Sequence, residues 1–290
     1  IMRLILAVPS AIVRQAESRI DIDADLGLRR RDESGPAAPS VLTVRNSEMG
    51  KVFIGAHRGA MCHAPENTLA AFEKAIEYAT YRVECDIRRA IDGTLVMMHD
   101  TTVDRMTDGT GNVDAMTLME LKQLRVGASE TIPTLAESLV CVSGRCRMLL
   151  ELKDDGIATD VVRTVEAANM LDACTLISFS EDNLREARRA NPDTLIGFFH
   201  LEPKPLDLGR VVDEFGANLL VVWPAAAQPE VIAAAKDAGL HVRCGFRDDM
   251  TYEESQAVFT RMVDMGVDEV SCGRPDWIGR MIGERQGLSV

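Results

Sequence analysis

The sequence of 290 residues is short of basic charge, of long apolar runs and of regularly spaced cysteines. Lysine and arginine number 32 against 45 aspartates and glutamates, so the net charge is −13. This argues against a nucleic-acid-binding protein, because such proteins neutralise phosphates with basic patches. The longest apolar run near the start is broken by Pro9 and falls far short of the roughly 20 residues of a membrane helix. The seven cysteines follow no tight repeat and are interpreted as reduced thiols, which favours a cytoplasmic location.

The first 48 residues are predicted to be an N-terminal extension. They lack a sustained hydrophobic period and run into a linker-like stretch rich in glycine and proline at 35–40. Their seven basic and seven acidic side chains cancel, so the whole net charge belongs to residues 49–290. Arg3 and the short apolar run behind it resemble a secretory signal without a clear cleavage site, which leaves a secreted or periplasmic location open.

Residues 49–290 are predicted to form one domain of alternating strands and helices. Strand-like runs occur at 52–56, 83–87, 148–152, 175–179, 195–199, 218–222, 240–244 and 268–272. Between them lie amphipathic stretches, such as Leu69, Phe72 and Ile76 at helical spacing. This alternation indicates parallel strands with right-handed crossovers. Eight such units in about 250 residues are the size of a TIM (β/α)8 barrel, with an open doubly wound sheet as the alternative.

A ninth strand-like run, at 94–99, lies too close to the second strand for a parallel return. A parallel return needs about a dozen residues or more, so this run is predicted to turn back as an antiparallel hairpin. Residues of about 100–145 then form a small insertion after the second strand, over the barrel mouth where the active sites of such barrels lie.

Three carboxylates are predicted to converge inside the barrel. Glu84 and Asp86 are two residues apart on the second strand, so they face the same side, and Glu151 ends the third barrel strand. Buried carboxylates repel one another unless a cation holds them. The predicted cofactor is therefore a divalent ion with oxygen ligands, Mg²⁺ or Ca²⁺. The alternative is a buried ionic network in which Arg58 and Lys153 neutralise the acids.

Two histidines and two cations are predicted at the same mouth. His57 follows the first strand and His99 ends the hairpin strand, and the near-neutral pKa of a histidine suits acid and base roles. Arg58 and Lys153 supply fixed positive charge where an anionic substrate would lie. Together with acids for a metal, these groups favour phosphoryl chemistry over acyl chemistry.

Several motifs of this chain resemble the glycerophosphodiester phosphodiesterase family in order and spacing. They are Ala56-His57-Arg58-Gly59, Ala64-Pro65-Glu66-Asn67-Thr68, Glu84-Cys85-Asp86, Met98-His99-Asp100, Val103-Asp104-Arg105, Gly109-Thr110-Gly111, Ile132-Pro133-Thr134-Leu135 and Glu151-Leu152-Lys153. The resemblance implies metal-dependent hydrolysis of a small phosphodiester to an alcohol and glycerol 3-phosphate.

The resemblance also implies a role for each site residue. Glu84, Asp86 and Glu151 would bind the metal, and Arg58 and Lys153 would hold the phosphate. His57 and His99 would be the acid/base pair, with His99 as the acid toward the leaving group. The hydroxyl next to the ester attacks phosphorus, and the resulting cyclic phosphate is then hydrolysed.

The chain departs from the family's usual pattern at the end of the seventh predicted barrel strand and after the eighth. Val242-Arg243-Cys244-Gly245-Phe246-Arg247 stands where the family usually has Trp-Thr-Val-Asn, and Ser271-Cys272-Gly273-Arg274-Pro275 where it usually has Thr-Asp-Arg-Pro. Arg243 and Arg247 are interpreted either as contacts to a polar or sugar-bearing group or as solvated loop charges. Trp223 is interpreted as an apolar wall for the leaving group or as core packing.

These departures leave other substrates and activities open. One is a phosphodiesterase or cyclising lyase that acts on a sugar diester of the opine type or on a lysophospholipid-like diester. Another is a non-catalytic binder of phosphodiesters. In each case the acidic surface favours a small diester over a long polyanion, and the sequence leaves the oligomeric state open.

Overall fold

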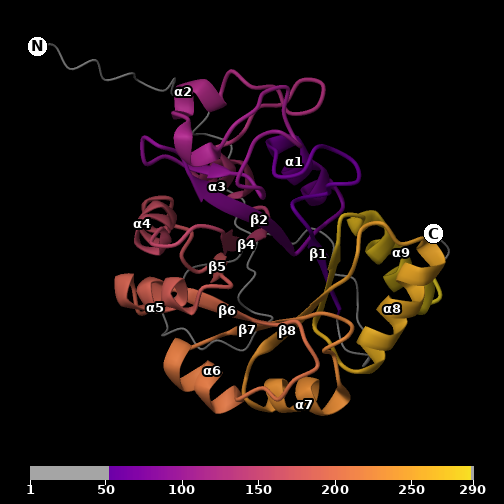
Figure 1. Ribbon diagram of the computed structural model, residues 1–290. Helices are drawn as coiled ribbons and strands as arrows, with labels where there is room; N and C mark the ends of the chain where they lie inside the picture. Colours follow the sequence, from indigo (N-terminus) through magenta and orange to yellow (C-terminus); the bar gives the residue numbers. More distant parts are fainter. Residues whose placement is uncertain (1–51, 289–290) are drawn as a thin grey trace, which may run out of the picture. The chain divides into compact units, whose positions relative to one another are not determined.

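The computed structural model describes residues 52–288, in which eight parallel strands close into a barrel (Figure 1). In their order around the barrel, the strands are β1 (Phe53–Ala56), β2 (Arg82–Arg89), β4 (Arg147–Leu152), β5 (Cys174–Ile177), β6 (Leu195–His200), β7 (Leu219–Val222), β8 (His241–Gly245) and β9 (Glu269–Cys272). Strand β1 pairs in parallel with both β2 and β9, which closes the ring. The TIM-barrel prediction is therefore confirmed, and the open doubly wound sheet is excluded.

Helices surround the barrel on its outer side, as Figure 1 shows. They are α1 (Leu69–Glu77), α3 (Leu135–Val142), α4 (Ala158–Ala167), α5 (Glu181–Ala190), α6 (Leu208–Phe215), α7 (Pro229–Asp237), α8 (Tyr252–Asp264) and α9 (Pro275–Arg285). Helix α1 begins where the Thr68 side chain accepts a hydrogen bond from the Ala71 backbone N–H, and its Phe72 is fully buried. None of the helices in the described range is long and apolar enough to cross a bilayer.

The strands alternate between a helix-facing side and an interior side. On β2, Val83, Cys85 and Ile87 pack into the apolar core that the helices cover. The intervening Glu84 and Asp86 therefore face the barrel interior, as the period of two predicts. This alternation places charged side chains inside the barrel.

The insertion after β2 begins with the predicted hairpin. Strand β3 (Leu95–Met97) pairs antiparallel with β2, outside the barrel ring. It is followed by the short 3-10 helix η2 (Val113–Ala115) and by α2 (Leu118–Leu121). The insertion has a small apolar core of its own, which includes Val103, Leu121 and Ile132. The predicted extension, residues 1–48, lies outside the described residues.

A buried ionic network, which we call the barrel floor, lies near the N-terminal ends of the strands. It comprises Arg82, His241, Arg243 and Glu269. The Glu269 carboxylate is fully buried, accepts a hydrogen bond from Arg243, and lies 3.2 Å from His241 Nε2 and 3.6 Å from Arg82 Nε. Arg243 also donates to Ser271 Oγ over 2.6 Å. Desolvation alone would raise the pKa of Glu269, but the charges of Arg82 and Arg243 hold it at about 2.

The interpretation of Arg243 was therefore wrong. Its side chain is 3% exposed and pairs inside the barrel, so it is neither a solvated loop charge nor an open substrate contact. Arg243 lies within the predicted strand run at 240–244, at an inward position of β8 directly beside Glu269 of β9, and this neighbour pairs with its charge inside the barrel. Arg247 lies beyond β8, is largely exposed and pairs with Asp249, as a solvated loop charge does.

Candidate active site

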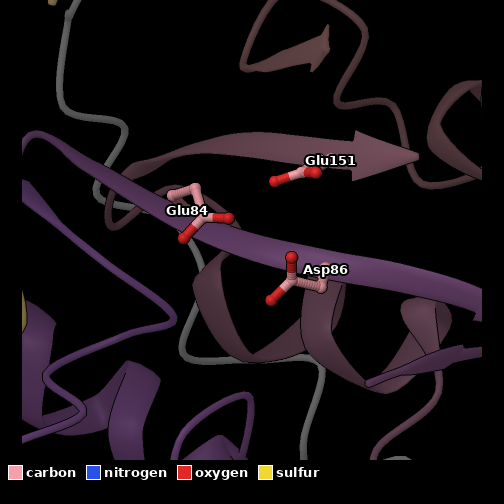
Figure 2. A group of neighbouring side chains, drawn as sticks. All are labelled: Glu84, Asp86 and Glu151. Atoms are coloured by element: carbon pink, nitrogen blue, oxygen red, sulfur yellow. The ribbon is translucent and has the colours of Figure 1, made fainter. Parts of the chain in front are cut away.

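Three carboxylates meet at the mouth of the barrel, near the C-terminal ends of β2 and β4. Asp86 and Glu151 are direct neighbours in the parallel register, and Glu84 lies one inward position before Asp86. Figure 2 shows Glu84 and Asp86 on β2 with their carboxylates turned toward Glu151 on β4. One oxygen of each lies within 4.8 Å of the others. Oxygens bound to one Mg²⁺ or Ca²⁺ lie up to about 4 to 5 Å apart, so the cluster fits such an ion.

The electrostatics of the cluster also fit a cation. Desolvation and the charge of Asp86 raise the pKa of Glu84, and the same two causes raise the pKa of Glu151 to about 7. Desolvation opposes ionisation of Asp86 as well, but the charges of Lys153 and Arg58 lower its pKa. Asp86 Oδ1 is buried and accepts no hydrogen bond from the described residues, with Lys153 Nζ 3.3 Å away as an ion-pair partner. The two cations thus neutralise the cluster only in part.

Lys153 and Arg58 contact the acid cluster from two sides. Lys153 Nζ lies 2.7 Å from Glu151 Oε1 and 3.3 Å from Asp86 Oδ1. Arg58 Nε lies 3.4 Å from Asp86 Oδ2, and the Arg58 backbone N–H donates to Glu84 Oε2 over 2.8 Å. The structure therefore brings both predicted phosphate-binding residues to the three acids.

Each predicted catalytic histidine is held by a carboxylate at Nδ1. His57 Nδ1 lies 2.6 Å from Asp248 Oδ2, and His99 Nδ1 lies 2.7 Å from Asp100 Oδ1. An ionised carboxylate only accepts hydrogen bonds, so each imidazole donates from Nδ1 and keeps Nε2 for proton exchange. His57 Nε2 lies 3.9 Å from Glu84 Oε2, and each histidine side chain is about one-third exposed, at 33% and 32%. This arrangement suits acid/base chemistry at the mouth.

The neighbours of His57 favour its protonated form. Burial alone would lower the pKa of His57. The hydrogen bond with Asp248 and the negative charge of Glu84 outweigh that effect and raise it. Asp248 lies 191 residues from His57 in the chain, just after β8. No motif of the sequence indicates Asp248 as this partner.

The loop between β1 and α1 is held in an unusual backbone conformation. Arg58 and Asn67 have positive φ angles of 50° and 57°, a region that residues with a side chain rarely adopt. The Asn67 backbone N–H donates to the Arg58 carbonyl over 3.0 Å. The Asn67 side chain donates from Nδ2 to Asp86 Oδ2 over 2.8 Å and accepts at Oδ1 from the Asp86 backbone N–H over 3.1 Å. The strained loop thereby fixes one carboxylate of the cluster.

A second arginine links this loop to the insertion. Arg105 donates to both Glu66 and Asp100, and Glu66 also accepts from Arg58. Glu66, Asn67 and Arg105 stand in the motifs that resemble the family, but their roles cannot be inferred from the motifs alone. Their partners are brought to them by the fold.

Apolar side chains line the inner side of β5, β6 and β7. Ile177, Phe199 and Val221 belong to one apolar cluster inside the barrel, on β5, β6 and β7. Phe179 follows Ile177 at the next inward position, is 67% exposed and stacks on Phe199, with ring centroids 4.4 Å apart. Trp223 continues β7 in the same way and is 39% exposed. Its exposure fits the predicted apolar wall better than core packing.

The sequence matches a known family over most of its length. The model of the glycerophosphoryl diester phosphodiesterase family matches residues 57–277. A glycerophosphodiester phosphodiesterase of Caldanaerobacter subterraneus subsp. tengcongensis is 34% identical over 252 residues, which cover 80% of this chain and 98% of that protein. Glycerophosphodiester phosphodiesterase 1 of Homo sapiens is 32% identical over 171 residues, which cover 54% of this chain and 51% of the human protein.

Solved structures of similar proteins share the fold. A glycerophosphodiester phosphodiesterase from Agrobacterium tumefaciens str. C58 has a TM-score of 0.70 and 28% identity, over 81% of this chain and 100% of that one. A phosphodiesterase from Oleispira antarctica, solved in complex with the product sn-glycerol-3-phosphate, has a TM-score of 0.70 and 26% identity, over 81% of this chain and 97% of that one.

Proposed function

The chain belongs to the glycerophosphoryl diester phosphodiesterase family and is a phosphoric diester hydrolase, and we propose that it cleaves a small glycerophosphodiester with a divalent metal ion and two histidines. The observation that supports this is the convergence of three carboxylates, His57 and two cations at one barrel mouth, with His99 close enough to lower the pKa of Asp86 by its charge. The products would be an alcohol and glycerol 3-phosphate. The net charge of −13 favours a small substrate over a long polyanion.

The substrate phosphate would lie between the cations and the acid cluster. Glu84, Asp86 and Glu151 would hold Mg²⁺ or Ca²⁺, which when bound offsets phosphoryl charge and acidifies a nearby hydroxyl. Arg58 and Lys153 would bind the phosphoryl oxygens, since both already reach this point of the mouth.

The histidines would move the protons at their Nε2 atoms. The glycerol hydroxyl next to the ester attacks phosphorus, and His57 Nε2 accepts its proton. As the bond from phosphorus to the leaving oxygen breaks, His99 Nε2 donates a proton to that oxygen. Water then opens the cyclic phosphate with the two roles reversed, which restores both histidines. Asp248 and Asp100 hold the two rings at Nδ1 throughout.

A panel of phosphodiesters tests this proposal. Purified protein would be incubated with glycerol- and sugar-based diesters under Mg²⁺, Ca²⁺ or chelator, and released phosphomonoester would be measured. We expect turnover that chelator abolishes and that His57→Ala or His99→Ala lowers by about 10²- to 10⁴-fold. His63→Ala is the matched control, because His63 pairs with Asp276 instead. Tight binding of diesters without turnover would contradict the proposal.

The apolar side chains on and just after β5 to β7 favour a second candidate function, the cleavage of a lysophospholipid-like diester. A hydrocarbon group on the substrate would cover Phe179 and Trp223, which are exposed at inward positions just after β5 and β7. Phe179→Ala should then raise KM for 1-acyl glycerophosphocholine much more than for glycerophosphocholine. Val140→Ala removes an apolar side chain that is 76% exposed on α3 and serves as the control. Equal KM values of wild type and Phe179→Ala for the acylated substrate would exclude this candidate.

A further inference from the structure

Arg105 makes more contacts than an ordinary surface arginine. Its guanidinium donates from Nε to Asp100 Oδ2 over 2.6 Å and from Nη2 to Asp100 Oδ1 over 3.0 Å. It also donates from Nη2 to Glu66 Oε1 over 2.8 Å and from Nη1 to Glu66 Oε2 over 3.0 Å. One planar fork therefore binds both oxygens of two carboxylates, a geometry that a lysine cannot reproduce.

Each of these two carboxylates also binds a residue of the candidate active site. Asp100 Oδ1 lies 2.7 Å from His99 Nδ1, and Glu66 Oε1 accepts from Arg58 Nη1 over 2.9 Å. Arg105 thus stands one carboxylate away from a proposed acid and one carboxylate away from a proposed phosphate ligand. A shift of the Arg105 guanidinium would therefore move both His99 and Arg58.

The backbone around Arg105 is fixed within the insertion. Val103 is fully buried in the small apolar core, and its backbone N–H donates to the Gly111 carbonyl over 3.0 Å. Asp104 Oδ1 accepts from the Gly111 backbone N–H over 2.9 Å. Two anchored residues precede Arg105, so the insertion presents its guanidinium from a defined position.

We propose that Arg105 is a positioning residue through which the insertion orients His99 and Arg58 together. The inference rests on the roles proposed above for these two residues. Without the guanidinium, Asp100 and Glu66 face each other as like charges, and each becomes free to turn away from its partner. His99 then presents Nε2 in varied directions, and Arg58 loses the fixed end of its ion pair. Small misplacements of catalytic groups cost about 10²-fold in rate.

The test compares Arg105→Ala with Arg125→Ala on two substrates. Arg125 lies in the same insertion and is largely exposed, and its side chain pairs with Asp108. The substrates are glycerophosphocholine and glyceryl p-nitrophenyl phosphate, whose leaving group needs little proton donation. Equal unfolding midpoints of the two variants would show that the fold is intact.

We expect Arg105→Ala to lower kcat for glycerophosphocholine by ten- to a hundredfold and to raise KM. The kcat loss should shrink on the p-nitrophenyl substrate, where His99 is needed less, whereas the KM rise through Arg58 should remain. Guanidinium ion in solution should restore part of the activity, and Arg105→Lys should restore less. Arg125→Ala should stay within twofold of wild type on both substrates.

His99→Ala separates the two ways in which the test can fail. If His99→Ala loses no activity on glycerophosphocholine, the proposed acid role is wrong. If His99→Ala shows the leaving-group dependence and Arg105→Ala stays within twofold of Arg125→Ala, the positioning role of Arg105 is wrong.

Discussion

The barrel floor predicts a defined loss of acid stability when its carboxylate is neutralised. Glu269 is fully buried among Arg82, Arg243 and His241, and its pKa is about 2 instead of 4.5. Each pKa unit corresponds to 1.36 kcal/mol, so the ionised carboxylate contributes about 3 kcal/mol to the free energy of unfolding. The folded-state pKa is depressed, so this contribution is present above pH 4.5 and is lost as the pH falls from about 4.5 to about 2.

Glu269→Gln keeps the shape of the side chain and removes the charge. We expect the free energy of unfolding at pH 7 to fall by about 3 to 5 kcal/mol, because two buried guanidinium groups lose their counter-ion. The difference between wild type and variant should narrow as the pH falls below 4.5. Urea unfolding across this pH range, followed by the fluorescence of Trp223 and Trp277, measures both effects.

The control for this measurement is Glu230→Gln, in the first turn of α7. Glu230 is exposed, so its substitution should change the free energy of unfolding by no more than about 1 kcal/mol. The reasoning would be refuted by a Glu269→Gln variant as stable as wild type at pH 7. It would also be refuted by a stability difference that stays constant as the pH falls from about 4.5 toward 2, over the part of that range in which both proteins fold.

Three further changes test the site and its support. Asp248→Asn should lower kcat at least tenfold and move the ascending limb of the pH–rate profile to lower pH, because the Asp248 carboxylate raises the pKa of His57. An ascending limb at the wild-type pH would contradict this role of Asp248. Asn67→Ala removes both side-chain hydrogen bonds to Asp86 and should raise the Mg²⁺ concentration for half-maximal activity by about 10- to 100-fold. An unchanged Mg²⁺ titration would contradict this supporting role of Asn67. Gly55→Ala would place a Cβ 2.7 Å from a Glu269 oxygen and should lower the free energy of unfolding in urea by about 1 to 3 kcal/mol. A variant as stable as wild type would contradict the predicted steric clash.

The sequence predicts the acid cluster well because its determinants are local. The period of two along a strand fixes that Glu84 and Asp86 face the same side, whatever the rest of the chain does. The parallel register then places Glu151 beside Asp86. The hairpin of β3 is predictable for the same reason, since a short connection excludes a parallel return.

The partners of the site residues depend on contacts that no local pattern encodes. Asp248 reaches His57 across 191 residues, from the position directly after a segment in which the chain departs from the usual family pattern. Arg105 is visible as part of a motif, but its two carboxylate partners come from different loops. Arg243 was misinterpreted because its partner, Glu269, lies on the neighbouring strand, and the register between β8 and β9 that pairs them is not encoded locally. The cytoplasmic location stays a prediction.

The insertion looks exchangeable because it has an apolar core of its own, yet Arg105 ties it to the barrel loops. In a chimera that carries the insertion of a related protein, the new insertion would set the orientation of His99 and Arg58. Recombination between related barrels should therefore preserve activity only when the β1–α1 loop and the whole insertion, residues 57–145, are transferred as one block. The active site would then depend on a segment that includes both a barrel loop and the insertion, and neither part could be exchanged without the other.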